Sequence, residues 1–146
     1  MPAPASEKPK IRVLHADDEF IMRDLVREIL IEEGNFEIHS YATGQEVLDA
    51  AKTLKPDLLL LDMMMPGMTG LQTLKEVQKI ETLSHIPAVF LTSRVSPEEI
   101  EAYYRAGAVG VLNKSSAFET LGKDVFSCWN AHRIVNLGNT GAAGED

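Results

Sequence analysis

Five short apolar runs alternate with amphipathic helical patterns along this 146-residue chain, and the alternation predicts an α/β fold built as a doubly wound (βα)5 parallel sheet. The third run, Leu58-Leu59-Leu60-Leu61, is apolar at every position, as is typical of a strand buried on both faces beneath helices. Polar or charged residues follow most of the runs. The expected strands are residues 11–16, 36–41, 58–61, 88–91 and 109–112.

Capping and stop signals place helices between these strands. Capping boxes begin at Thr43, Ser96 and Ser116, and Pro97 occupies the first helical position after the second of them. Gly34 directly follows the first helical pattern and is a stop signal. The expected helices are residues 20–33, 43–54, 69–81, 97–107 and 116–135.

The order of the strands in the sheet follows from chain connectivity. Right-handed crossovers between parallel strands leave few topologies, of which the flavodoxin-like order 2-1-3-4-5 is one. In that order the switch point lies between the first and third strands, where ligands bind beyond the carboxyl ends of the strands. Asp17 and Asp18 follow the first strand and Asp62 follows the third, so the three carboxylates are expected to converge there.

Composition and charge limit the classes of function. One domain is expected over residues 11–136, between a flexible Pro-rich lead-in at residues 1–10 and a flexible tail at residues 137–146. No stretch of about 18 apolar residues occurs, which argues against a membrane span. The net charge of −8 argues against nucleic-acid partners. Cys128 is the only cysteine, which excludes a thiolate metal site within one chain and fits a cytoplasmic protein.

The three converging carboxylates predict a metal site. Like charges at one sheet edge repel one another and stay ionised together only with a cation, and oxygen ligands favour Mg²⁺ or Mn²⁺. Asp18 and Asp62 are the expected direct ligands, with the backbone carbonyl of Met64 as a third and Asp17 acting through water. The alternative for the acid pair is a solvated helix cap.

Two further strand ends suggest phosphoryl chemistry. A carboxylate such as that of Asp62 can act as a nucleophile toward phosphorus and form an aspartyl phosphate. Lys114 follows the fifth strand and offers an ammonium group to the phosphoryl oxygens, and Thr92 follows the fourth and offers a hydroxyl. Taken singly, Thr92 is equally well an ordinary strand-end hydroxyl and Lys114 a surface charge.

Taken together, these residues resemble the receiver domain of bacterial two-component response regulators, and the resemblance covers residues 11–135. It is carried by Asp17-Asp18, by Asp62 with Pro66 and Gly70 behind it, by Thr92-Ser93, by Lys114, and by the spacing between them. The resemblance, which is to single-domain, CheY-like members, implies that Asp62 accepts a phosphoryl group from a histidine kinase. It also implies that Asp17 and Asp18 hold Mg²⁺ and that Thr92 and Lys114 contact the phosphoryl group.

The chain departs from the family pattern beyond the phosphoryl site. Ser115 follows Lys114 where the family usually has a proline, so a cis peptide bond is not assumed. Val111 stands where the family often has a Tyr or Phe that turns inward, and a small β-branched side chain cannot make that movement. Tyr103 and Tyr104, on the preceding helix, are candidates to replace it, with one packed and one at the rim; the alternative is that both simply pack against the sheet.

Three further side chains are expected at the pocket or at a partner surface. Met64 and Arg94 lie two residues after Asp62 and Thr92, respectively, and Met64 offers no polar group to orient a hydrolytic water. Slow loss of the phosphoryl group is therefore expected. Arg94 is expected to guard the pocket or to meet a partner carboxylate, unless it is simply solvated. Phe126 lies off the apolar arc of the last helix and is a candidate exposed contact.

The function expected from the sequence is a stand-alone phosphoacceptor switch, which is not an enzyme and has no output domain. The expected partners are a sensor histidine kinase or phosphotransfer protein, a downstream target protein and a second copy in a homodimer, with no nucleic acid and no membrane. Three alternatives stay open: a vestigial receiver that only docks proteins, the receiver part of a longer regulator, and a phosphohydrolase with Asp62 as nucleophile. Met64 counts against the phosphohydrolase because such enzymes commonly place a second acid at that position.

Overall fold

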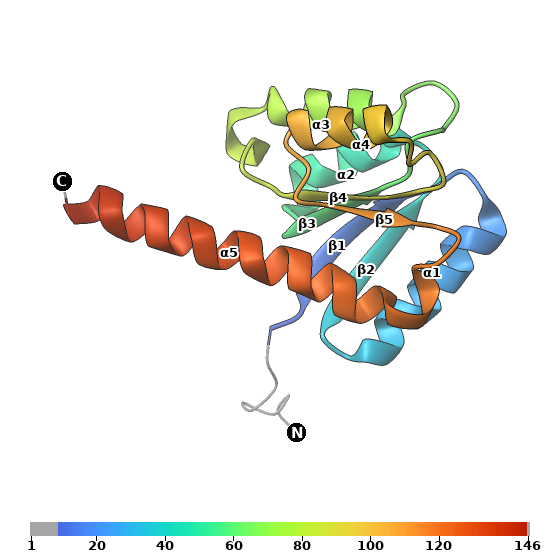
Figure 1. Ribbon diagram of the computed structural model, residues 1–146, viewed down its shortest axis with the longest axis horizontal. Coiled ribbons are helices and arrows are strands. Elements are labelled where there is room, and N and C mark those ends of the chain that lie inside the picture. The colour runs from blue at the N-terminus through green and yellow to red at the C-terminus, as the bar shows by residue number, and fades with distance from the viewer. Residues whose placement is uncertain (1–8, 146) are drawn as a thin grey trace.

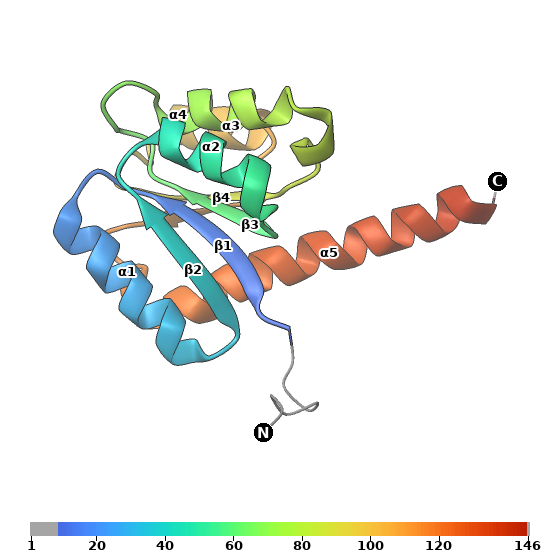
Figure 2. The same ribbon diagram turned by 180° about the vertical axis from the view of Figure 1, so that it is seen from behind.

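A five-stranded parallel sheet lies between two layers of helices (Figures 1 and 2). The computed structural model describes residues 9–145, with side chains as far as residue 137, so all but the end of the predicted lead-in at residues 1–10 lies outside the described residues. The strands are β1 (Ile11–Ala16), β2 (Phe36–Tyr41), β3 (Leu58–Leu61), β4 (Ala88–Thr92) and β5 (Gly110–Asn113). Their order, β2-β1-β3-β4-β5, confirms the predicted flavodoxin-like topology.

The helices divide between the two faces of the sheet. One face is covered by α1 (Phe20–Glu33) and α5 (Leu121–Glu145), and the other by α2 (Gly44–Leu54), α3 (Gly70–Gln78) and α4 (Pro97–Arg105) (Figures 1 and 2). Two short 3-10 helices, Glu81–Leu83 and Phe118–Thr120, precede β4 and α5. Within residues 9–145, no helix is long and apolar enough to cross a membrane.

The four leucines of β3 explain why this strand lies at the centre of the sheet. All four are completely buried, and successive side chains of a strand point to opposite faces. Leu59 and Leu61 accordingly belong to the core beneath α2, α3 and α4, while Leu58 and Leu60 belong to the core beneath α1 and α5. The strand therefore holds both helical layers, and it carries Asp62 to the edge of the sheet.

Gly70 allows α3 to begin directly against the backbone of Asp62. Its N–H donates to the carbonyl of Met63 at 2.9 Å, and Thr69 caps the helix with a complete capping box formed with Gln72. A Cβ atom at position 70 would lie 2.3 Å from the carbonyl oxygen of Asp62. Only glycine permits this approach, so the residue also fixes the loop that follows Asp62.

Several predicted element boundaries are wrong. The helix predicted over residues 69–81 ends at Gln78, and the helix expected from Ser116 begins at Leu121 after a 3-10 turn. The last helix also continues beyond the predicted end near Val135 to Glu145, and His132 contacts Asn136 at 2.7 Å along it. The flexibility predicted for residues 137–146 stays a prediction.

Candidate functional site

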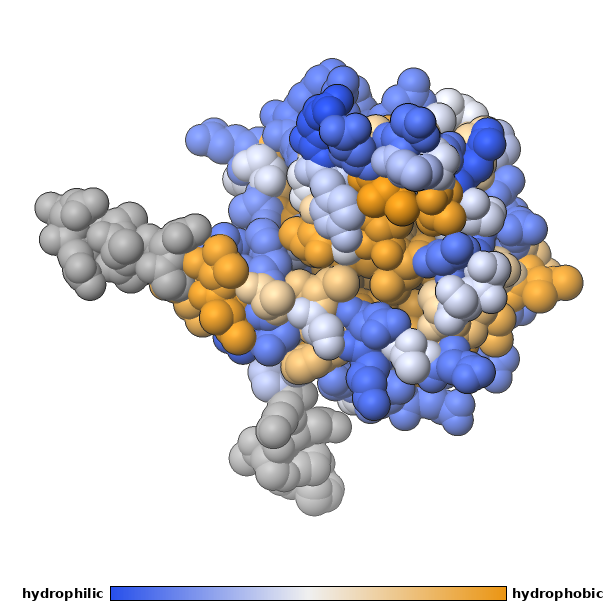
Figure 3. All heavy atoms as spheres, in the orientation of Figure 1, coloured by the Kyte–Doolittle hydropathy of each residue, from blue (hydrophilic) through white to orange (hydrophobic). Residues whose placement is uncertain are grey.

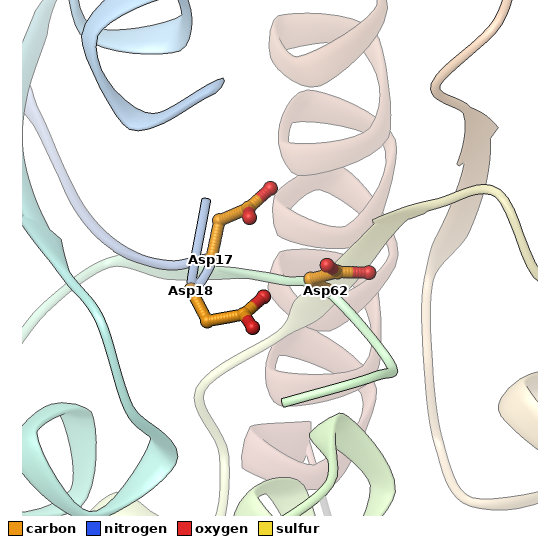
Figure 4. A group of neighbouring side chains, drawn as sticks. All are labelled: Asp17, Asp18 and Asp62. Atoms are coloured by element: carbon orange, nitrogen blue, oxygen red, sulfur yellow. The ribbon is translucent and has the colours of Figure 1, made fainter. Parts of the chain in front are cut away.

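Asp17, Asp18 and Asp62 meet at the carboxyl edge of the sheet, as the topology predicted. Ala16 and Leu61, the last residues of β1 and β3, are partners in the sheet, so the residues that follow them leave side by side. The backbone N–H of Asp62 continues the ladder by donating to the carbonyl of Ala16 at 3.0 Å. One carboxylate oxygen from each of the three acids lies within 4.8 Å of the others (Figure 4).

Lys114 brings a buried positive charge to these acids. It follows β5, and its backbone N–H donates to the carbonyl of Thr92 at 3.0 Å. Its ammonium nitrogen lies 2.7 Å from Oδ2 of Asp17 and 2.9 Å from Oδ2 of Asp62. Burial by itself lowers the pKa of Lys114, but the hydrogen bonds and charges of Asp17 and Asp62 outweigh burial and raise this pKa above its usual value. The lysine therefore stays protonated and bridges the two acids.

The residues present fit a divalent cation. Asp17 Oδ2 is buried and accepts no hydrogen bond of good geometry, although the Lys114 nitrogen lies close to it. Burial raises the pKa of the Asp17 carboxyl, mainly by disfavouring its charged form. One ammonium group cannot balance three carboxylates, and Asp18 is exposed on the open side of the group. A hard cation with oxygen ligands would supply the missing positive charge and would satisfy the orphaned oxygen.

Thr92 and Arg94 complete the pocket on the side of β4. Thr92 is fully buried, and its hydroxyl oxygen accepts a hydrogen bond from the backbone N–H of Arg94 at 3.1 Å. The Arg94 guanidinium lies 3.7 Å from the sulfur of Met64 and 3.9 Å from a carboxylate oxygen of Glu99. Arg94 and Met64 thus form one rim of the pocket. The residues that line it are Asp18, Glu19, Asp62, Met64, Thr92, Ser93, Arg94 and Lys114.

The two tyrosines of α4 occupy different environments. Tyr103 is buried, stacks on Phe90 with ring centroids 4.5 Å apart, and donates its hydroxyl hydrogen to the carbonyl of Arg94 at 2.6 Å. Tyr104 is half exposed. Val111 is partly buried and packs against the same core as Tyr103. Tyr103 is thus the packed tyrosine, whereas Tyr104 does not line the pocket, and the replacement of an aromatic residue at position 111 by either of them stays a prediction.

The loop after Lys114 follows a trans path. In the described part of the chain no peptide bond is cis, so the bond between Lys114 and Ser115 is trans. Asn113 stabilises this turn because its side-chain oxygen accepts hydrogen bonds from both the N–H and the hydroxyl of Ser115. The ammonium group of Lys114 reaches Asp62 without the cis peptide usual in the family.

Glu19 is a pocket residue to which the sequence analysis assigned no role. Its carboxylate lies 3.2 Å from the Lys114 nitrogen, although the side chain is largely exposed. Its position directly after Asp17-Asp18 is the one feature of the sequence that could have indicated a role in the pocket. A solvated residue at the start of a helix would have the same position. Phe126, by contrast, lies away from the pocket on α5, where it is partly exposed beside Trp129.

Replacement of Lys114 tests the charge balance of the site. We expect Lys114→Met to lower the free energy of unfolding by about 3 kcal/mol without divalent cations, because Asp17 and Asp62 lose their buried partner. Mg²⁺ should restore more stability to the variant than to the wild type. Denaturant unfolding measures both, and Lys79→Met, which removes an exposed pair with Glu76, should cost less than about 1 kcal/mol. Equal losses in the two variants would contradict the proposed charge balance.

Comparisons with known proteins agree with this geometry. The response regulator receiver domain family matches residues 13–126. Chemotaxis protein CheY of Halobacterium salinarum is 36% identical over 104 residues, which cover 70% of this chain and 83% of that protein. A protein-glutamate methylesterase/protein-glutamine glutaminase of Rhodopseudomonas palustris is 35% identical over 103 residues, which cover 70% of this chain and only 27% of that protein.

Solved structures show the same fold. The chemotaxis protein CheY4 of Vibrio cholerae superposes with a TM-score of 0.75 at 30% identity, over 82% of this chain and 98% of that one. The receiver domain of NarL from Mycobacterium tuberculosis gives a TM-score of 0.75 at 28% identity, over 84% of this chain and 98% of that one. With the family match spanning most of its length, the chain belongs to the response regulator receiver domain family, and its domain is CheY-like.

Proposed function

We propose that Asp62 accepts a phosphoryl group from a sensor histidine kinase or a phosphotransfer protein, and that phosphorylation changes a protein-binding surface of the domain. The observation that carries the proposal is the buried Asp62 carboxylate, which lies 2.9 Å from the Lys114 ammonium group and beside Asp17 and Asp18. A nucleophilic carboxylate, a fixed cation and a cluster of metal-binding oxygens are the parts that phosphoryl transfer to an acid requires.

The residues would share the transfer as follows. A carboxylate oxygen of Asp62 forms the new bond to phosphorus while the bond from phosphorus to the donor's imidazole nitrogen breaks, and the leaving imidazole takes up a proton. Lys114 donates hydrogen bonds to the phosphoryl oxygens, and Thr92 donates its hydroxyl hydrogen to another of them. Mg²⁺, or Mn²⁺, held by Asp17, Asp18, Asp62 and the carbonyl of Met64, would neutralise negative charge on the phosphoryl group.

We infer that the domain signals by binding and not by catalytic turnover. Every residue of the proposed site lies between Asp17 and Lys114, so the switch needs no group from another domain. Met64 occupies the position from which a second carboxylate would serve a phosphohydrolase. A stand-alone regulator is supported by the likeness to the chemotaxis protein, of which the chain covers 83%. The match to 27% of a methylesterase supports the second candidate, a receiver within a longer regulator.

The proposed partner surface is the face formed by α4, β5 and α5. Apolar side chains gather on this side of the molecule between α4 and α5 (Figure 3). Tyr104 and Phe126 contribute exposed aromatic rings from the two helices, and Val111 lies on β5, the edge strand of the sheet. Burial of aromatic side chains dominates many protein interfaces, so this face suits a target protein or a second copy in a homodimer.

Phosphorylation by a small-molecule donor tests the assignment of Asp62. With acetyl phosphate and Mg²⁺, the wild type should gain one phosphoryl group by intact-protein mass spectrometry, and Asp62→Asn should gain none. Asp57→Asn is a matched control because Asp57 precedes β3 at the opposite edge of the sheet, and it should be phosphorylated normally. Chelation of the cation should abolish the reaction. A wild type that neither binds Mg²⁺ nor gains phosphate would instead favour a protein-docking module.

The side chain of Met64 should prolong the phosphorylated state. Half of its surface is exposed at the rim of the pocket, and it gives an attacking water nothing to bond with. We expect Met64→Asn, which adds an amide at this place, to shorten the lifetime by roughly an order of magnitude in a phosphate-release assay. Ile134→Asn, at an exposed position on α5, should leave the lifetime unchanged. Rapid loss of phosphate from the wild type would contradict the expectation.

A further inference from the structure

Arg94 is the point at which the pocket is tied to the rest of the fold. Its backbone N–H donates to the hydroxyl oxygen of Thr92 at 3.1 Å, and its carbonyl accepts from the hydroxyl of Tyr103 at 2.6 Å. The same backbone residue is thus held by the phosphoryl-site threonine on one side and by α4 on the other. Only four residues separate the end of β4 from the start of α4, so a displacement of Arg94 reaches the helix directly.

Tyr103 belongs to the core beneath α2, α3 and α4, against which Val111 of β5 also packs. Its ring stacks on Phe90 with only 10° between the ring planes, and Phe90 pairs with Val111 across β4 and β5. Tyr103 is 1% exposed, and burial raises the pKa of its phenol above the usual value.

We propose that Tyr103 is the residue that transmits occupancy of the Asp62 site to α4 and β5, in place of an aromatic side chain at position 111. This inference rests on the proposed phosphorylation of Asp62. When Thr92 turns its hydroxyl toward a phosphoryl oxygen, the N–H of Arg94 loses its acceptor. The bond from Tyr103 then becomes the remaining tether of that backbone, so the segment between β4 and α4 moves together with the helix.

The contacts of Tyr103 make it a better candidate than Tyr104 or Arg94 to transmit a change from the pocket to α4. Tyr104 is half exposed and is not among the residues that line the pocket, so it can report a change at the surface only. The Arg94 side chain lies 3.7 Å or more from Met64 and Glu99, so its contacts at the rim of the pocket are weak. Tyr103 alone among these residues combines complete burial with a short hydrogen bond to the loop.

Removal of one hydroxyl group tests the proposal in the full chain. Backbone amide NMR spectra of the wild type, Tyr103→Phe and Tyr41→Phe are compared with Mg²⁺, before and after addition of beryllium fluoride as a phosphoryl mimic. Tyr103→Phe keeps the ring stack and loses only the bond to Arg94. Tyr41→Phe is the matched control, because Tyr41 ends β2 at the same sheet edge and packs against the same core.

The expected result distinguishes binding of beryllium fluoride at Asp62 from transmission of that binding to α4 and β5. All three proteins should show shift changes around Asp62, because none of the substitutions touches the proposed ligands. In α4 and β5, the changes should fall to about half or less in Tyr103→Phe, since a buried hydrogen bond alters an equilibrium by about fivefold. Unreduced changes in α4 and β5 of Tyr103→Phe would overturn the proposal while leaving the proposed function intact. A wild type without any response would overturn both.

A second measurement needs no substitution. In wild-type protein with 13C-labelled tyrosine rings, the resonance of Tyr103 should shift when beryllium fluoride is added, while that of Tyr41 should stay constant. An unchanged Tyr103 resonance in a protein whose Asp62 amide responds would overturn the proposal, even if the Tyr103→Phe variant failed to fold.

Discussion

Three carboxylates and one buried ammonium group lie at a single edge of the sheet, so negative charge exceeds positive charge there. The other features of the site depend on this excess of negative charge. Lys114 bridges Asp17 and Asp62 at hydrogen-bonding distance, which keeps the lysine protonated and both acids within reach of one ligand. The bridge leaves an oxygen of Asp17 without a well-formed hydrogen bond. A site that is short of positive charge favours a divalent cation, and with the cation bound it can accept the further negative charge of a phosphoryl group.

The parallel sheet explains why such a cluster persists. β3 is buried on both faces, so Asp62 is held by two hydrophobic cores, and Gly70 lets α3 pack directly against its backbone. The packing that fixes Asp62 also connects the pocket to the outer helices of the domain. Thr92 ends β4, and Lys114 directly follows the neighbouring strand β5. The short segment after Thr92 leads into α4, whose Tyr103 donates a hydrogen bond to Arg94 in that segment. In the proposed mechanism, a change in charge at Asp62 would act on contacts that already join the site to α4.

The parts of this structure that follow local rules could be predicted from the sequence, and the parts that depend on side-chain packing could not. Four consecutive leucines identify a central strand, and chain connectivity brings Asp17, Asp18 and Asp62 together, because both depend on regular geometry. The contact between Glu19 and Lys114, the bond from Tyr103 to Arg94 and the length of α5 lie outside such rules. They depend on side-chain rotamers and on tertiary packing, which the pattern of apolar residues does not record.

Chemical mapping of the phosphorylated residue tests the central claim most directly. Borohydride reduces an aspartyl phosphate to homoserine, so protein treated with acetyl phosphate and Mg²⁺ can be reduced, digested and sequenced by mass spectrometry. The account predicts homoserine at position 62, in the peptide that contains the four leucines of β3, and unmodified aspartate at positions 17 and 18. Homoserine at one of those two positions, or phosphate retained on Thr92 or Ser93 after reduction, would contradict it.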